Sequence, residues 1–264
     1  MMRLLMIGDI VGTPGQSALY DHLPRLKRGY HPDLIVVNGE NAADGRGITR
    51  SIAREMMGSG VDCITLGNHA WDKREVFDFI DDEPRILRPA NYPEGTPGRG
   101  FARISSRQGE LAVISLMGRS FLSSVDCPFR RADSLLKQLK PGTPVFVDFH
   151  AETTSEKQAL AWYLQGRVSA VVGTHTHVQT ADERILPQGT AYLSDVGMTG
   201  PYDGVLGMDR DLVVKKFLTQ LPVRFEVSQG RTQLNGVVID IQPSTGKAKR
   251  IERVRIDDDQ PWFE

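Results

Sequence analysis

The stretch VSAVVGTHTH (168–177) joins an apolar run directly to a pair of histidines. Its first part is rich in valine and does not alternate with polar residues, as is typical of a strand buried on both faces of a parallel sheet. Alternate residues of an extended segment point to the same side, so His175 and His177 can face one site. Such a pair belongs either to a metal site or to an ordinary protein surface. The residues that follow the other apolar runs decide between these two interpretations.

Six other apolar runs of the same kind occur along the chain, and amphipathic stretches separate several of them. The runs are residues 3–8, 33–37, 61–66, 111–116, 144–149 and 190–194. This alternation predicts βαβ units around a largely parallel sheet. We expect one helix over residues 16–28, which Pro24 should break or kink. Another should begin at Asp72 as its cap and bury an apolar stripe that includes Phe77.

The pattern changes after about residue 220. RFEVSQ (224–229), QLNGVVIDIQ (233–242) and AKRIERVRI (248–256) are predicted strands, and a PSTGK turn joins the last two into an antiparallel hairpin. The sequence shows no repeat, low-complexity segment or flexible linker. We therefore expect a single domain over residues 1–264.

Composition excludes several classes of function. The 32 basic and 33 acidic residues leave a net charge of −1, which gives no electrostatic attraction to long nucleic acids or anionic membranes. No apolar run approaches the ~18 residues of a membrane span, and Asp9 interrupts an amino-terminal stretch too short for a signal peptide. A cytoplasmic location is expected. Cys63 and Cys127 form no CxxC pair, so neither a disulfide framework nor a thiolate zinc site is expected.

Side chains that bind metals follow five of the predicted strands. They are Asp9, then Asn38, Glu40 and Asn41, then Asn68 and His69, then His150, and finally His175 and His177. The carboxyl ends of parallel strands lie along one edge of a sheet, where ligands bind. Most of these groups, taken alone, are better explained as a turn, a cap or a core histidine, and only for the pair His175 and His177 are the two explanations equal. Their repetition at the same topological position favours a metal site.

The ligand types indicate the chemistry. Carboxylate, imidazole and amide oxygen ligands without thiolates suit iron, manganese or zinc. The candidates outnumber what one tetrahedral ion requires, which favours two ions sharing a bridging carboxylate. Two ions ~3.5–4 Å apart can generate a bridging hydroxide near neutral pH and stabilise both oxygens of an in-line phosphoryl displacement. The residues therefore predict a two-metal phosphoesterase.

Six motifs, in order along the chain, resemble the calcineurin-like metallophosphoesterases and, within them, the bacterial YmdB-like family. They are GDIVG (8–12), NGENAA (38–43), GNHAWD (67–72), HAETTSEK (150–157), GTHTHVQT (173–180) and SDVGMTGP (194–201). The resemblance implies an α/β fold, a four-layer αββα sandwich with mixed sheets. It also implies that the metal centre lies at the carboxyl ends of the strands.

The same resemblance implies a role for each site residue. One metal would be held by Asp9, Glu40, Asn41 and His177, and the other by Glu40, Asn68, His150 and His175, with Glu40 bridging. His69 would act as the general acid, a role that suits histidine because the ordinary pKa of an imidazole, ~6.5, lies near working pH. The alternative is a metal-binding or purely positional role for His69. Val11 stands where the broader superfamily usually has a histidine. Glu40 stands where that superfamily usually has a bridging aspartate. These harder ligands favour iron first and manganese second over zinc.

The resemblance implies that the substrates are 2′,3′-cyclic or 3′,5′-cyclic nucleotides and simple phosphate esters, and a homo-oligomer is expected. Two alternatives stay open. One is a metal- and phosphate-binding regulatory protein with little turnover. The other is an RNA-processing nuclease, which the near-zero net charge disfavours.

Beside the site, Arg46 in the loop 42–47 is either a substrate contact or a solvated residue. Asp72 either orients His69 or caps a helix, and Asp148 is interpreted as structural.

Overall fold

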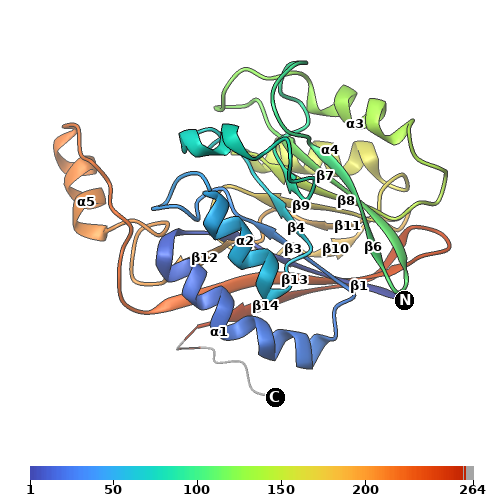
Figure 1. Cartoon of the computed structure of the whole chain (residues 1–264), viewed down its shortest axis with the longest axis horizontal. Helices are drawn as coiled ribbons and strands as arrows, with labels where there is room; N and C mark the ends of the chain where they lie inside the picture. Colours follow the sequence, from blue (N-terminus) through green and yellow to red (C-terminus); the bar gives the residue numbers. More distant parts are fainter. Residues whose placement is uncertain (258, 260–264) are drawn as a thin grey trace.

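This computed structural model describes residues 1–257 and 259. The described chain forms two β-sheets, and the first of them contains the strands nearest to both ends of the chain (Figure 1). Residues 258 and 260–264 of the predicted domain lie outside the described part. The strand order is β2-β12-β13-β1-β3-β4-β5, with β14 paired to β13. The strands are β1 (Met2–Ile7), β2 (Asp9–Ile10), β3 (Leu34–Asn38), β4 (Cys63–Thr65), β5 (Ile86–Leu87), β12 (Met198–Pro201), β13 (Thr232–Gln242) and β14 (Lys247–Ile256).

Strand directions in this sheet are mixed. β1, β3, β4 and β5 run parallel, whereas β13 is antiparallel to both β1 and β14. The predicted carboxyl-terminal hairpin is therefore confirmed, and its first strand lies inside the sheet rather than at an edge. The parallel half directs the residues that follow β1, β3 and β4 to one end of the sheet.

The second sheet has the order β10-β11-β9-β8-β7-β6. Its strands are β6 (Phe101–Ser106), β7 (Gly109–Met117), β8 (Val145–His150), β9 (Ala170–Thr174), β10 (Arg184–Ile185) and β11 (Ala191–Leu193). The central four run parallel, and β6 and β10 pair antiparallel at the two edges. The carboxyl ends of β8 and β9 thus bring His150 and the 175–177 segment together.

Helices cover the outer face of each sheet, as Figure 1 shows. The helices α1 (Gly12–Tyr30) and α2 (Arg50–Ser59) lie on the first sheet, and α3 (Pro128–Leu136) and α4 (Thr154–Leu164) lie on the second. Strand alternation explains the arrangement, because successive side chains point to opposite faces. In β1, Leu5 packs toward α1 and α2, whereas Leu4 packs toward the second sheet.

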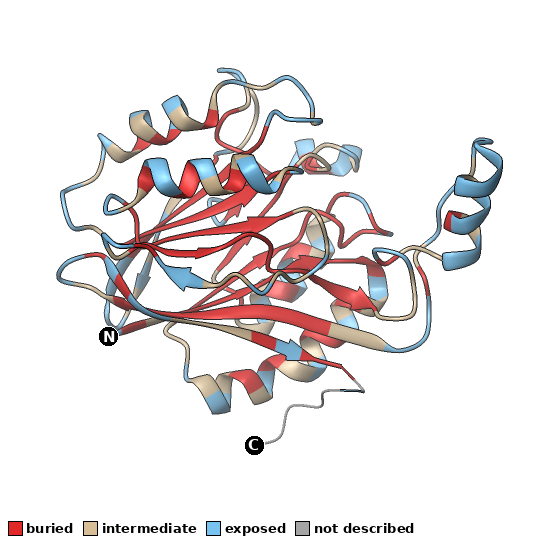
Figure 2. Cartoon of the chain, turned by 180° about the vertical axis from the view of Figure 1, so that it is seen from behind, coloured by how far each residue is buried: buried red, intermediate tan, exposed pale blue. Residues whose placement is uncertain are grey.

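Three apolar cores result in the described part of the chain, one at each interface between layers. The middle core joins residues of both sheets, including Leu4 and Phe146, and the outer cores join a sheet to its helices through residues such as Leu23 and Leu160. Figure 2 shows this as buried strands between helices that are exposed on their outer sides. The predicted four-layer αββα sandwich is confirmed.

Three local predictions are wrong. Residues 224–229 form no strand apart from a single bridge at Val227, because no strand of the described chain lies beside most of the segment. Asp72 caps no helix: only the short 3-10 helix η1 (Arg74–Asp78) follows, and Phe77 is 50% exposed. Pro24 does not break α1, since the helix continues to Tyr30 with one face packed on the sheet.

One helix that the sequence did not predict, α5 (Arg210–Thr219), stands away from the sandwich in both views (Figures 1 and 2). Asp209 caps it by accepting hydrogen bonds from the backbone N–H groups of Asp211 and Leu212. Among the helices in the described part of the chain, none combines the length and the apolar character needed to cross a membrane.

Candidate metal centre

The two sheets bring the predicted ligands to a common end of the sandwich. Glu40 and Asn68 lie in the turns after β3 and β4 of the first sheet. His150 ends β8 of the second sheet, and His175 directly follows β9. Glu40 and His150 are buried, and Asn68 and His175 are partly exposed. The site therefore straddles the interface between the sheets.

Nε2 of His150 is the point on which the other three of these residues converge. It lies 3.0 Å from Oε1 of Glu40, 2.9 Å from Oδ1 of Asn68 and 3.0 Å from Nδ1 of His175. Potential ligand atoms of Glu40, His150 and His175 all lie within 4.8 Å of one another. The four residues predicted for the second metal thus meet in one cluster, with two carboxylate or amide oxygens and two ring nitrogens facing inward.

The ligands predicted for the first metal lie beside this cluster. Asp9 and Asn41 are buried, and in each the side-chain Oδ1 accepts no hydrogen bond from the described residues. The other oxygen of Asp9 accepts a bond of 3.3 Å from the backbone N–H of His175. A buried oxygen without a partner costs about 1–3 kcal/mol, and a bound cation would remove that cost. These orphaned oxygens fit a metal ion.

Each histidine predicted to bind metal has one ring nitrogen fixed by a neighbour. Nδ1 of His150 lies 2.9 Å from Oγ1 of Thr174, and Nε2 of His175 lies 2.9 Å from Oε2 of Glu152. Nδ1 of His177 donates to the backbone carbonyl of Leu206 at 3.0 Å. Such partners hold the ring in place and leave the opposite nitrogen as the ligand atom. No local sequence pattern marks these three partners, because each pairing depends on the fold.

Asp148 forms a buried hydrogen-bond network directly beneath the site. Its Oδ1 accepts from the hydroxyl of Thr174 at 2.7 Å, and its Oδ2 accepts from Thr65 at 2.5 Å and from Nδ2 of Asn38 at 3.1 Å. The interpretation of Asp148 as structural is therefore too narrow. Through Thr174 this carboxylate acts on the orientation of His150.

Burial and neighbouring charges set the protonation of the cluster. Burial alone would raise the pKa of Glu40, but the charge and hydrogen bond of His150 outweigh it and lower that pKa to about 2. Burial would lower the pKa of His150, but Glu40 and Asp9 raise it to about 9. Burial and the adjacent His150 lower the pKa of His175 to about 3. Metal binding to His150 must therefore displace a proton.

His69 lies at the edge of the cluster, and its ring contacts a carboxylate outside the cluster rather than the other predicted ligands. Its Nδ1 is 2.9 Å from Oδ2 of Asp72, and its backbone N–H donates to Oε2 of Glu40 at 3.1 Å. Its side chain is 24% exposed and lines the cleft over the cluster. The sequence leaves Asp72 either as a helix cap or as a residue that orients His69. The geometry agrees with the second interpretation, because Asp72 bonds His69. A ring held by a carboxylate at one nitrogen is suited to proton transfer at the other.

The cleft over the cluster has a volume of about 1020 Å³. Its lining combines site residues with the loop 44–46 and the segments 206–208 and 223–225 on either side of α5. The lining residues are Glu40, Asn41, Asp44, Gly45, Arg46, His69, Asp72, Lys73, Glu152, His175, Thr176, His177, Leu206, Met208, Val223, Arg224 and Phe225. Lys73 pairs with Asp44 at 2.9 Å. Arg46 and Arg224 are exposed on the cleft wall, where they add positive charge.

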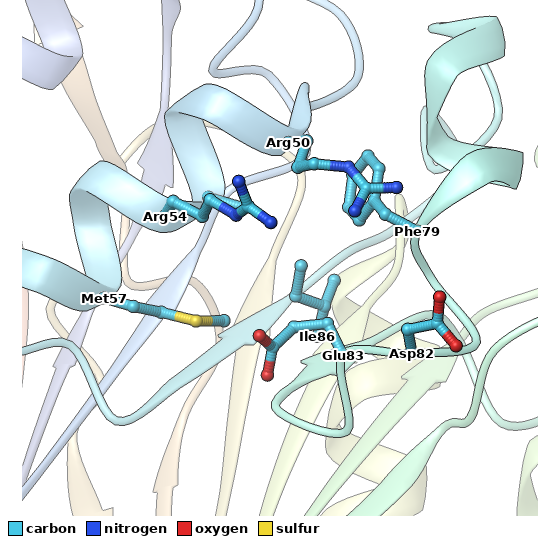
Figure 3. A pocket seen from close by; sticks show the side chains of 8 residues that line it. Arg50, Arg54, Met57, Phe79, Asp82, Glu83 and Ile86 are labelled. Atoms are coloured by element: carbon cyan, nitrogen blue, oxygen red, sulfur yellow. The ribbon is translucent and has the colours of Figure 1, made fainter.

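A second hollow, shown in Figure 3, differs from the metal centre in size and in chemistry. It holds about 100 Å³ between α2 and the segment 79–86. Arg50 crosses it with its guanidinium 5.3 Å from the centre of the Phe79 ring and bonds the carbonyl of Asp78. Its lining, within the described residues, includes no histidine and none of the predicted metal ligands.

Comparison with known proteins agrees with this geometry. The YmdB-like protein family matches residues 5–254. A Bacillus subtilis (strain 168) protein named 2′,3′-cyclic-nucleotide 2′-phosphodiesterase is 59% identical over 264 residues, which cover 100% of each chain. The structure of a novel phosphatase from Mycoplasma pneumoniae is similar, with a TM-score of 0.92 and 33% identity over 97% of this chain and 93% of that one.

A hypothetical protein from Thermus thermophilus has the same fold, with a TM-score of 0.92 and 43% identity over 97% of this chain and 99% of its own. The match to the family pattern covers nearly all of the described chain, from before the first site residue to near the end of the carboxyl-terminal hairpin. The chain therefore belongs to the YmdB-like family.

Proposed function

We propose that this chain is a metal-dependent phosphodiesterase that hydrolyses 2′,3′-cyclic or 3′,5′-cyclic nucleotides and simple phosphate esters. The observation that carries the proposal is the convergence of Glu40, Asn68 and His175 on Nε2 of His150. The name of the Bacillus subtilis relative makes 2′,3′-cyclic nucleotides the first substrates to test.

Two ions would be held by the predicted ligands, iron first and manganese as the alternative. Asp9, Glu40, Asn41 and His177 would hold one ion, and Glu40, Asn68, His150 and His175 the other. The orphaned oxygens of Asp9 and Asn41 and the inward-facing ring nitrogens support this assignment. When bound, the metals supply Lewis-acid activation of water and of the phosphoryl group near neutral pH.

The residues around the ions perform the remaining work. His69, held by Asp72, donates a proton to the oxygen that leaves phosphorus, which for a 2′,3′-cyclic substrate is a ribose hydroxyl. Arg46 and Arg224 on the cleft wall attract the anionic substrate. At about 1020 Å³ the cleft is large enough for a mononucleotide.

The test is metal content by elemental analysis of anaerobically purified protein, together with hydrolysis of 2′,3′-cyclic AMP and bis-p-nitrophenyl phosphate. About two ions per chain and turnover that a chelator abolishes are expected. Protein without bound metal would refute the ligand assignment. Two ions without turnover of either ester would favour the regulatory protein that binds a phosphate ligand.

A further inference from the structure

A buried ion pair contacts the segment that carries His175 and His177. Nζ of Lys157, in α4, donates to Oδ2 of Asp195 at 2.8 Å, and the two side chains are only 2% and 1% exposed. A lysine is almost never buried to this extent unless it is paired. Neither residue is a predicted metal ligand or the proton donor. The proposed reaction therefore leaves this pair without a role.

The carboxylate of Asp195 holds the residue between the two histidines. Its Oδ2 accepts from the backbone N–H of Thr176 at 3.0 Å and from the Thr176 hydroxyl at 2.7 Å. Its Oδ1 accepts from the backbone N–H of Gly197 at 2.8 Å. Because Lys157 donates to the same Oδ2 as Thr176, the lysine fixes the carboxylate, and the carboxylate in turn fixes Thr176.

The backbone on both sides of Thr176 needs such a support. The angle φ is +100° at His175 and +65° at His177, in the left-handed region that residues with a Cβ rarely adopt. Such conformations persist only where the surrounding structure fixes them. Hydrogen bonds to a charged acceptor are roughly twice as strong as neutral ones. The Asp195 carboxylate thus holds the middle of the turn at the point where the backbone is strained.

The fold leaves space for the lysine stem at a glycine of β9. A Cβ at Gly173 would lie 1.8 Å from the carbonyl oxygen of Ser194 and 2.8 Å from Cδ of Lys157. Glycine at this position therefore lets both Lys157 and the segment before Asp195 approach the strand closely. The pair joins three of the six sequence motifs, which are residues 150–157, 173–180 and 194–201.

We propose that Lys157 and Asp195 are positioning residues that hold His175 and His177 in the conformation that binds metal. The inference rests on the proposed function, in which each of the two histidines supplies a ring to a different ion. An apolar pair of similar volume would fill the same space without the desolvation cost of two charges. It could not accept hydrogen bonds from Thr176, so the turn would lose its support.

The experiment compares Mn²⁺ affinity, measured by calorimetric titration, with the melting temperature of the metal-free, full-length chain. Lys157→Met leaves the buried carboxylate unpaired, so the melting temperature should fall by roughly 6–20 °C. Mn²⁺ binding should weaken about 10–100-fold, as is typical when a residue that orients a ligand is lost.

A double variant separates positioning from stability. Adding Asp195→Asn to Lys157→Met removes the unpaired charge, so at least half of the lost melting temperature should return. The affinity should stay about 10–100-fold weaker, because an amide has one oxygen and cannot accept from both Thr176 and Gly197. If the affinity returns together with the melting temperature, the pair is only structural and the proposal is overturned.

The matched control removes an ion pair at the surface beside the other end of α4. Nη1 of Arg167 lies 2.6 Å from Oδ1 of Asp133, and these side chains are 43% and 30% exposed. Arg167→Met with Asp133→Asn should leave Mn²⁺ affinity unchanged. A control variant that binds Mn²⁺ as weakly as the Lys157 variants would overturn the specific role of the buried pair.

Hydrogen exchange of the metal-free chain reports on the turn without any metal. Peptides that cover residues 174–180 should exchange at least tenfold faster in the double variant, while peptides of β8 exchange as before. Unchanged exchange of the turn would overturn the proposal. An unaltered chain that binds no Mn²⁺ would overturn the role in metal binding together with the proposed function, and the exchange rates distinguish that result from a failure of the pair alone.

Discussion

Replacing His69 with alanine separates proton donation from metal binding. The imidazole bonds Asp72 through Nδ1, whereas the contact of this residue with the cluster is made by its backbone N–H to Glu40. Truncation of the side chain removes the first bond and leaves the second. We therefore expect metal content to stay close to that of the unaltered protein, while the rate falls by the about 10²–10⁴-fold that a general acid contributes.

The size of the loss should depend on the leaving group. Opening of 2′,3′-cyclic AMP expels a ribose oxygen that must be protonated, so kcat should fall about 10²–10⁴-fold. Bis-p-nitrophenyl phosphate expels a phenolate that departs without a proton, so its rate should fall less than about tenfold. Asp72→Asn is the matched variant, because it keeps a hydrogen-bonding group beside His69. Its kcat should fall less than that of His69→Ala on 2′,3′-cyclic AMP and should not change on bis-p-nitrophenyl phosphate. Equal losses on both esters, or loss of bound metal, would refute the general-acid role.

Three further predictions concern the scaffold of the site. Asp148→Asn places an amide donor among existing donors, so we expect the free energy of unfolding in urea to fall by about 1–3 kcal/mol. Mn²⁺ binding should weaken about 10–100-fold, and unchanged binding would show that the network does not position His150. Burial raises the pKa of Asp9 to about 6, and Glu40 and Asp9 raise that of His150 to about 9. Mn²⁺ affinity should therefore rise about tenfold for each pH unit between these two pKa values, as measured by calorimetric titration; a flat profile contradicts this. Leu4→Ala and Leu160→Ala should each cost about 2–5 kcal/mol of unfolding free energy, but only Leu4, between the sheets, should also change Mn²⁺ affinity; equal effects on affinity would contradict it.

The site is largely predictable from sequence because topology alone places most of its residues. Parallel strands of one sheet end at one edge, so the ends of the apolar runs 144–149 and 168–172 are brought together in the second sheet. The run 61–66 belongs to the first sheet, and its end joins them because the two sheets pack face to face. The same rule explains why His150 and His175 meet although they are 25 positions apart in the chain. Boundaries differ by only a few residues, since strand ends depend on pairing with neighbours.

The missed features depend on tertiary partners. Residues 224–229 have the composition of a strand, but they follow the projecting helix α5, and within the described chain only Val227 of this segment finds a bridging partner. Phe77 fits a helical stripe, yet the segment tightens into η1 and turns the ring outward. The bond from His175 to Glu152 and the bond from His177 to the carbonyl of Leu206 depend on loop conformations that no local pattern specifies.

The position of the candidate metal centre between two sheets is a reason for the buried polar network at this end of the sandwich. The first sheet supplies Glu40 and Asn68, and the second supplies His150 and His175, so the ligand geometry depends on the spacing of the sheets. An apolar core fixes that spacing without direction, because dispersion contacts have no preferred angle.

Hydrogen bonds between the sheets add direction where the ligands need it. Asp148 of β8 accepts from Asn38 of β3 and Thr65 of β4, and the Ser115 hydroxyl of β7 donates to the carbonyl of Leu66 at 2.9 Å. Burial raises the pKa of Asp148, so the carboxylate is kept at a cost in stability. Metal ligands tolerate errors of only about 0.2 Å. A directional link between the sheets, close in the chain to both His150 and Asn68, is a physical reason for this chain to accept that cost.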